Sequence, residues 1–222
     1  MSAGELKFGA VVGSDGVWCE LLNRTQGAGL RPALFLDRDG VVVEEVHYLH
    51  RVEDTRLVPG ASDVIGHANR AGVPVVVVTN QSGIGRGTYG WPEFAAVQET
   101  MLEALNDAGA FVNAVYACPF HEDGIAPWRV AEHPDRKPSP GMLNRAASRL
   151  ALDLSASWII GDRAGDVGAG LNAGLTGAMH VASGHGNVEG ERAQALDLSS
   201  ESFRVLTGNS IADARGQIPL LA

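Results

Sequence analysis

Short apolar runs alternate with amphipathic stretches along most of this chain. The clearest run spans residues 73–78 and is nearly all β-branched, which is typical of a strand covered on both faces of a parallel sheet. Shorter runs predict four further strands, at residues 33–36, 111–117, 157–160 and 177–181. The chain therefore has five strand candidates, separated by stretches of a different period.

Between these runs, apolar residues recur at helical spacing. The spacing and the prolines that precede several segments predict three helices and one shorter Ala- and Gly-rich helix, at residues 60–71, 92–109, 140–150 and from about Asp166. Residues 79–87 are expected to form a polar turn, and residues 186–222 one or two short helices and a tail. Strand and helix alternate throughout, which predicts an α/β fold. Its doubly wound, Rossmann-like parallel sheet would carry helices on both faces.

The length of 222 residues fits one main domain, which we place at residues 32–210. Residues 1–31 are Gly-rich and weakly patterned, so they are expected to form an N-terminal extension, and residues 211–222 a C-terminal tail. The longest connections, residues 41–59 and the polar loop at 118–139, are too short for a large cap domain over the strand ends.

Composition narrows the range of partners. The formal net charge of −9 and the pI near 5.2 disfavour nucleic acid or an acidic membrane surface as the main partner. No apolar run is long enough to span a membrane, and the first residues do not have the pattern of a secretory signal. Two cysteines make no disulfide framework and fit a reducing cytoplasm. Because no long exposed apolar helix is evident, a monomer is expected.

The residues best suited to chemistry follow predicted strand ends. Asp37 and Asp39 lie one residue apart directly after the first strand, where two carboxylates repel each other and lose hydration. A divalent cation or a phosphoryl group would offset that repulsion. Thr79 and Asn80 follow the second strand, and Asp162 follows the fourth. In a parallel sheet these ends lie on one edge, so the side chains are expected to converge.

These groups are the parts that phosphoryl transfer requires. Asp37 would be the nucleophile, and Asp39 would protonate the leaving alcohol and then deprotonate water. Mg²⁺ on Asp37, Asp162 and a backbone oxygen near Asp39 would remove the charge repulsion. Lys137 and the Thr79 hydroxyl would hold the phosphate oxygens. Taken singly, each residue has a structural explanation as a turn former, a solvated cation or, for Asp166, a helix cap.

In chain order, four segments resemble the motifs of the haloacid dehalogenase (HAD) superfamily of phosphatases. They are Asp37-x-Asp39-Gly40, the strand that ends in Thr79, Lys137-Pro138, and Gly161-Asp162-x-x-x-Asp166. The resemblance covers about residues 32–185. It implies the same catalytic roles, with Mg²⁺ at Asp37, Asp39 and Asp162 and with Asp166 as a residue that supports the metal site.

A narrower resemblance concerns the D-glycero-D-manno-heptose 1,7-bisphosphate 7-phosphatases, with the histidinol-phosphatase domain as a close relative. It is carried by residues 35–40, 78–87 and 136–142. The resemblance implies hydrolysis of a small sugar phosphate, the heptose bisphosphate at its 7-phosphate, through an aspartyl-phosphate intermediate. It also implies that the substrate pocket is lined by Glu45 to Tyr48, Asn80, Gln81, Ser82, Arg136 and Arg163.

The chain departs from this family in the loop at 118–136, where the family often carries a zinc site. Cys118 is kept, but Phe120 stands at the position of the family's histidine, and His133 and Asp135 replace two later cysteines. His121 is adjacent to the lost position. These replacements favour a loop held by packing and hydrogen bonds. Zinc bound by Cys118, His121, His133 and Asp135 is the alternative.

Other functions remain open at the level of sequence. The same chemistry would serve histidinol phosphate, another metabolite, or a nucleic-acid 3′-phosphate end, and the acidic composition disfavours the last. A different class is a phospho-acceptor module, whose Asp is phosphorylated but not rapidly turned over. Such a module needs no acid/base group two residues after its nucleophile, whereas this chain has Asp39.

Overall fold

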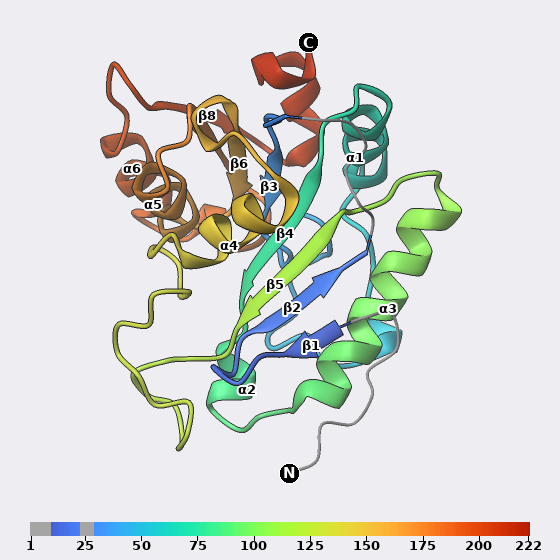
Figure 1. The fold of residues 1–222 in the computed structure, drawn as a ribbon, viewed down its shortest axis with the longest axis vertical. Coiled ribbons are helices and arrows are strands. Elements are labelled where there is room, and N and C mark those ends of the chain that lie inside the picture. Colours follow the sequence, from blue (N-terminus) through green and yellow to red (C-terminus); the bar gives the residue numbers. More distant parts are fainter. Residues whose placement is uncertain (1–9, 23–28) are drawn as a thin grey trace.

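The computed structural model describes residues 10–22 and 29–222, which fold around one eight-stranded sheet (Figure 1). The strand order is β1-β2-β5-β4-β3-β6-β7-β8. The strands, in chain order, are β1 Ala10–Val12, β2 Trp18–Leu21, β3 Leu34–Leu36, β4 Val75–Asn80, β5 Ala114–Cys118, β6 Trp158–Gly161, β7 Gly177–Val181 and β8 Arg204–Gly208. Strands β3 to β8 pair in parallel, while β1 and β2 run antiparallel to their neighbours.

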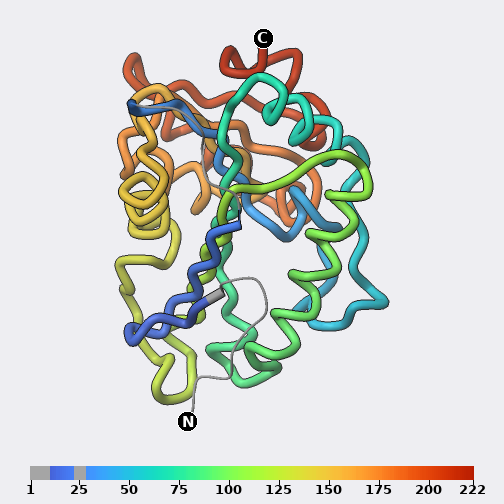
Figure 2. The backbone as a smooth tube through the Cα atoms, turned by 45° about the vertical axis from the view of Figure 1, so that its right-hand side comes forward, coloured from blue at the N-terminus to red at the C-terminus, as the bar shows by residue number. Residues whose placement is uncertain are grey.

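Helices cover both faces of the sheet. They are α1 Ala61–Arg70, the single turn α2 Ser82–Gly85, α3 Trp91–Asp107, α4 Gly141–Leu150, α5 Ala164–Asn172 and α6 Glu191–Asp197. Figure 1 shows α1 and α3 on one side of the sheet and α4, α5 and α6 on the other, and the turned view in Figure 2 separates the same two layers. Each α-helix layer therefore shields one face from water.

The alternation of side chains along the strands builds two cores. In β4, Val75 and Val77 point to the α1/α3 side, and Val76 and Val78 point to the α4/α5 side. All four are fully buried. A run of β-branched residues satisfies both environments, because each of its two sides meets an apolar layer.

The topology brings the ends of β4, β3 and β6 side by side. These three strands are neighbours in the sheet and run parallel. The Asp37 N–H continues the ladder by donating to the Ile160 carbonyl at 2.9 Å. Residues that follow these strands are far apart in the sequence but share one edge of the sheet, as expected from the apolar runs.

The α/β fold, the five predicted strands and the predicted helices are confirmed, with shifts at their ends. The sequence predicted a polar turn at residues 79–87, and the predicted start of this turn is wrong. Thr79 and Asn80 still pair with β5, and the one-turn helix α2 follows. Helix α5 begins at Ala164, before Asp166.

Both ends of the described chain contribute more to the sheet and core than the sequence predicted. Strands β1 and β2 form an antiparallel hairpin, and β2 pairs with β5, so the sheet is not purely parallel. Their pattern is too short to stand out from the Gly-rich segment around it. Residues 1–9 and 23–28 of the expected extension lie outside the described residues.

At the other end, β8 pairs in parallel with β7, and the residues after it pack under α1. Ile211, Ala214, Ile218 and Leu221 are buried in the core on that side. The His67 ring lies 3.0 Å from the Leu221 carbonyl oxygen. The division of the chain at residues 31 and 211 stays a prediction.

The connections that could have carried a cap contain little regular structure. Between β3 and α1 the only helical element described is a 3-10 turn, Val52–Asp54, and between β5 and α4 none is found. None of the helices in the described ranges has the length and apolar character needed to cross a lipid bilayer.

Candidate active site

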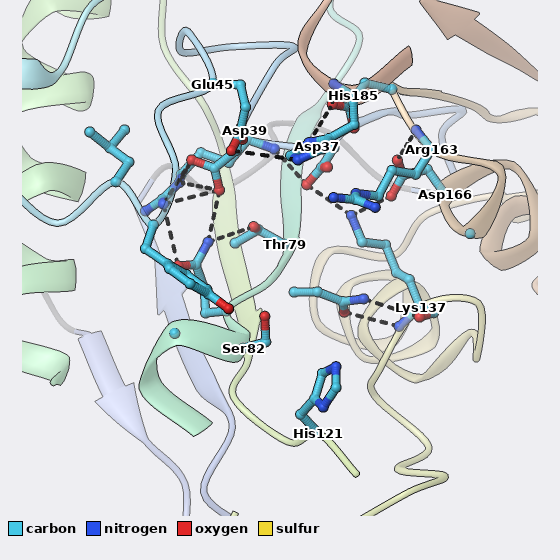
Figure 3. A pocket seen from close by; sticks show the side chains of 18 of the residues that line it. Asp37, Asp39, Glu45, Thr79, Ser82, His121, Lys137, Arg163, Asp166 and His185 are labelled. Carbon is cyan, nitrogen blue, oxygen red and sulfur yellow. Dashed lines mark hydrogen bonds and ion pairs between the residues drawn. The ribbon is translucent and has the colours of Figure 1, made fainter. Parts of the chain in front are cut away.

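A pocket of about 510 Å³ opens at the carboxyl edge of the sheet (Figure 3). It is lined by every residue predicted for catalysis, for phosphate or substrate contact, or for Mg²⁺: Asp37, Asp39, Glu45 to Tyr48, Thr79, Asn80, Gln81, Ser82, Arg136, Lys137, Asp162, Arg163 and Asp166. The predicted convergence on one edge is therefore present in the structure.

The floor of the pocket is a buried ion cluster around Lys137. Its ammonium group lies 2.8 Å from Asp37 Oδ1 and 2.6 Å from Asp166 Oδ1, and it donates to the Val78 carbonyl at 2.8 Å. The side chain is buried. Burial lowers the pKa of Lys137, but Asp166 and Asp37 outweigh it and hold that pKa above its usual value. The cation is thus fixed in its charged form beside the predicted nucleophile.

The same ion cluster accounts for the raised pKa of Asp37. Burial, the main cause, and the nearby Asp166 and Asp39 carboxylates raise the pKa of Asp37 to about 7, against the opposing effect of Lys137. One cation therefore does not fully offset the negative charge on the pocket floor. The Arg38 N–H donates to Asp37 Oδ1 at 2.8 Å and holds the carboxylate in place.

Asp162 adds a third carboxylate to this floor. Oxygens of Asp37, Asp162 and Asp166 lie within 4.8 Å of one another, and all three residues are buried. Burial, together with Asp37 and Asp166, raises the pKa of Asp162 to about 9. Hard oxygen donors at this spacing, with an excess of negative charge, fit Mg²⁺. The three converging carboxylates are therefore the structural support for a Mg²⁺ site here.

Two glycines keep the approach to Asp162 clear. Gly40 and Gly184 have φ angles of 81° and 60°, and a Cβ atom on either one would collide with the Asp162 carboxylate. The His185 N–H donates to Asp162 Oδ2 at 2.7 Å. The two loops therefore meet around this carboxylate, and glycine is required by both space and backbone conformation.

Asp166 has two structural contacts as well as its place beside Asp37. One oxygen accepts from the Arg163 N–H at 2.9 Å, which caps the start of α5, and the other pairs with Lys137. The cap suggested by the sequence is therefore present. The Asp39 carboxylate lies apart from this cluster of donors, because it is bound by Arg38 and Gln81.

The predicted phosphate-binding residues differ in how they are held. The Thr79 oxygen accepts from the Gln81 amide at 2.8 Å. Asn80 accepts from the Lys137 N–H and donates to the Lys137 carbonyl, each at 3.0 Å. Asn80 therefore fixes the backbone of the segment that carries Lys137. Ser82, at the start of α2, is half-buried on the pocket wall (Figure 3).

The mouth of the pocket is formed by loops and is more exposed. Burial and the Asp39 and Asp37 carboxylates raise the pKa of Glu45 to about 7. Tyr48, on the same loop, has a positive φ of 56°. Arg163 is exposed and lies 3.7 Å from Glu191. These side chains surround the entrance, where a bound molecule would extend from the reacting group.

Arg136 lies next to the buried Lys137 but at the mouth. Its guanidinium donates to the Phe120 carbonyl at 2.9 Å and is half-buried. Arg86, which follows α2, pairs with Asp123 at 3.1 Å and contacts the His121 ring. Two arginines and a histidine thus line this side of the pocket.

The residues of the possible zinc loop do not gather as a metal site within the described chain. The Cys118 sulfur is 3.9 Å from His133 Nδ1, and burial raises the pKa of the Cys118 thiol to about 12. Asp135 is buried and accepts two hydrogen bonds of 2.7 Å from Arg145. His121 contacts Arg86 instead. Asp135 and His121 are thus each paired with an arginine, so these four residues do not present a set of free zinc ligands.

Packing and charge hold this loop instead. The Phe120 ring stacks on His133 with centroids 3.9 Å apart. Arg145 also pairs with Asp15 in the β1–β2 turn at 2.7 Å. The loop that presents Arg136 is therefore tied both to α4 and to the N-terminal hairpin.

The pocket also contains residues that the sequence did not single out, among them Arg38, Arg86, Tyr89, His185 and Glu191. His185 follows closely after β7, so the rule of strand ends would have found it, whereas Glu191 lies further along, at the start of α6. Arg38 occupies the unspecified position of the Asp37-x-Asp39 motif, so the motif gives it no role. Tyr89 has no signal in the sequence, because it precedes a helix and meets Gln81 only in the folded chain.

Comparison with known proteins adds independent findings. The family model described as HAD-hydrolase-like matches residues 135–210. A curated D-glycero-beta-D-manno-heptose-1,7-bisphosphate 7-phosphatase from Mesorhizobium japonicum is 50% identical over 160 residues. The match covers 72% of this chain and 74% of that protein.

Two solved structures are similar to this one. A protein described as a HAD-like phosphatase, from Mesorhizobium loti, has a TM-score of 0.73 and 44% identity, covering 82% of this chain and 90% of its own. A D,D-heptose 1,7-bisphosphate phosphatase from B. bronchiseptica was solved with magnesium and phosphate. It has a TM-score of 0.72 and 30% identity, covering 86% of this chain and 99% of its own.

Proposed function

The chain belongs to the HAD-like family of heptose-bisphosphate phosphatases and is a phosphoric monoester hydrolase, and from this premise we propose that it removes the 7-phosphate of D-glycero-D-manno-heptose 1,7-bisphosphate. The observation that carries the proposal is the buried cluster of Asp37, Lys137, Asp162 and Asp166 on the pocket floor. We also infer a monomer in the cytoplasm that acts on this small metabolite.

In the proposed reaction, Asp37 attacks the phosphorus atom and the bond to the sugar oxygen breaks. Asp39 gives its proton to that oxygen, so the sugar leaves as a neutral alcohol. Asp39 then removes a proton from water, which attacks the aspartyl phosphate and releases Asp37. Thr79 and Lys137 would stabilise the charge on the phosphate oxygens.

Asp37 and Asp162 would hold Mg²⁺, together with a backbone oxygen near Asp39, and Asp166 lies beside this set. When bound, the ion offsets the repulsion between the Asp37 carboxylate and the phosphate. Lys137 already uses contacts to Asp37, Asp166 and Val78. To bind the phosphate, one N–H group of the Lys137 ammonium would therefore have to be shared between its present partner and a phosphate oxygen.

The bisphosphate preference is supported by the separation of two cations. Lys137 is buried on the floor, whereas Arg136 is at the mouth. One would serve the reacting phosphate and the other the distal phosphate. Glu45, Tyr48, Asn80, Gln81, Ser82 and Arg163 line the space around the sugar in this proposal. The name of the relative from Mesorhizobium japonicum specifies the β anomer.

Turnover of a defined set of phosphate esters tests this proposal. We expect the highest kcat/KM, with Mg²⁺, for heptose 1,7-bisphosphate, and lower values for heptose 7-phosphate and histidinol phosphate. Both anomers of the bisphosphate should be measured. A higher kcat/KM for histidinol phosphate would contradict the substrate, and equal values for all esters would indicate a generalist.

The Asp37→Asn variant tests the nucleophile. Activity should fall more than about a thousandfold, because an amide cannot form the phosphoenzyme. Asp107→Asn is the matched control, since Asp107 is exposed at the end of α3. Full activity of Asp37→Asn would refute the mechanism whatever the substrate.

A further inference from the structure

The Asp39 carboxylate is held by three donors. Arg38 Nη2 lies 2.9 and 3.0 Å from its two oxygens, and Arg38 Nε lies 3.2 Å from each. Gln81 Nε2 donates to Asp39 Oδ2 at 2.9 Å. Arg38 is itself 1% exposed, and its guanidinium lies 5.0 Å from the centroid of the Phe94 ring. The orientation of Asp39 is therefore set by a buried partner rather than by solvent.

The Gln81 side chain joins Asp39 to Thr79. Its single amide nitrogen donates to Asp39 Oδ2 and, at 2.8 Å, to Thr79 Oγ1. Its oxygen accepts from the Tyr89 hydroxyl and from Arg38 Nη2 at 3.3 Å. With both of its ends bound, this amide has one orientation. Because Thr79 accepts here, its own hydrogen remains to be donated to a phosphate oxygen.

Tyr89 is the outer support of this amide. Its ring is half-buried on the pocket wall and stacks on His50, with centroids 5.6 Å apart. Burial raises the pKa of Tyr89 above its usual value, so the hydroxyl keeps its proton and acts as a donor. The contact to Gln81 is hence directional, and it fixes which end of the amide faces Asp39.

We infer that Gln81, Tyr89 and Arg38 are positioning residues that align the Asp39 carboxyl group with a phosphate bound at Thr79. The inference rests on the proposed roles of Asp37 and Asp39. As Asp37 bonds to phosphorus, the bond to the leaving oxygen breaks and that oxygen takes the Asp39 proton. A misaligned Asp39 slows this step most for a leaving oxygen that depends strongly on the proton.

Leaving-group dependence separates alignment from a merely structural role. The value of kcat/KM reports steps up to departure of the leaving group. We therefore compare aryl phosphates, from 4-nitrophenyl to phenyl phosphate, with heptose bisphosphate as the alkyl ester. In Tyr89→Phe, kcat/KM for heptose bisphosphate should fall about fivefold, the effect of one hydrogen bond. The value for 4-nitrophenyl phosphate should change less than about twofold, because its phenolate leaves without protonation.

Gln81→Met is the second variant, which keeps the volume and removes the amide. The kcat/KM for heptose bisphosphate should fall about a hundredfold. Inorganic phosphate should also inhibit about fivefold more weakly, because Thr79 loses its partner. Tyr116→Phe is the matched control, since Tyr116 is buried on β5 and does not line the pocket. Its leaving-group dependence should equal that of the unmodified enzyme.

Three results bear on the inference in different ways. Equal losses on every ester in Tyr89→Phe and Gln81→Met, or no loss in either, would overturn the positioning role. If Asp39→Asn itself showed equal losses for all leaving groups, the acid role of Asp39 would be wrong, and the inference would fall with it. Retained activity in Asp37→Asn would instead refute the proposed function.

Discussion

The floor and the mouth of the pocket are built in opposite ways. The floor consists of Asp37, Lys137, Asp162 and Asp166, which are all buried. Lys137 pairs with Asp37 at 2.8 Å and with Asp166 at 2.6 Å, and Asp162 lies beside both carboxylates. The mouth consists of loop residues such as Glu45 to Tyr48, Arg86, Arg136 and Arg163, most of them half-buried or exposed. The floor follows strand ends, and the mouth follows loops.

Under the proposed function, this difference separates the residues for chemistry from those for recognition. A buried charge needs fixed partners, so the floor tolerates little change. A loop side chain near water keeps more freedom and forms weaker, replaceable contacts. The loop at 118–136 illustrates the point, because its shape rests on the Phe120–His133 stack and the Asp135–Arg145 pair. We therefore expect changes at the floor to abolish turnover and changes at the mouth to alter substrate preference.

The largest effect is expected at Lys137. In Lys137→Met, Asp37 and Asp166 would be left buried without their cation, and the free energy of unfolding should fall by about 3 kcal/mol. Activity should fall more than about a thousandfold, because charge on the phosphate oxygens loses its partner. Urea unfolding and kcat/KM give the two values.

Lys137→Arg is the matched variant, since it keeps the charge but not the compact shape. It should recover part of the stability and little of the activity. A fully active Lys137→Met enzyme would show that the floor is not needed for chemistry. The proposed difference in role between floor and mouth would then be wrong.

An intermediate effect is expected at Arg136. In Arg136→Met, KM for the bisphosphate should rise about tenfold, because the distal phosphate loses a charge-assisted contact. For 4-nitrophenyl phosphate, kcat/KM should stay within about twofold, since that ester carries no second phosphate. Arg215→Met, at an exposed position, serves as the control. An equal decrease of kcat/KM for both substrates would contradict this role and indicate that Arg136 acts on the reacting phosphate, like the floor residues.

The smallest effect concerns pH and Mg²⁺. The pKa values of Asp37 and Asp162, about 7 and about 9, lie above the ordinary value of 3.8. The folded chain therefore binds more protons than the unfolded chain in this window. Without metal, stability should decrease as the pH rises from about 4 to about 9.

Mg²⁺ binds the deprotonated carboxylates, so the rise in Tm that it causes should be larger at about pH 8.5 than at about pH 6. Asp162→Asn, at the floor, should remove most of this rise. Glu45→Gln, at the mouth, should preserve it. A rise in Tm that survives in Asp162→Asn would argue that the ion binds elsewhere.

Much of the fold was predictable because strands buried on both faces leave a strong apolar signal. Residues 73–78 and 177–181 are examples, and the polar residues after such runs indicated the active edge. Strands β1, β2 and β8 were missed because the first two are short and the last is only partly buried. The Asp15–Arg145 pair joins residues 130 positions apart, and no local pattern marks it.

In this protein the order of apolar runs and the polar residues that end them determined the α/β class, the edge of the sheet that carries the pocket, and the candidate catalytic groups. That information is local, because a buried strand and its last residues are neighbours in the chain. Only the tertiary structure decided that Lys137 binds Asp37 and Asp166, and that Tyr89 reaches Asp39 through Gln81. Such contacts depend on how the loops are arranged in space. Loop sequences have no hydrophobic periodicity, so this arrangement cannot be predicted from them.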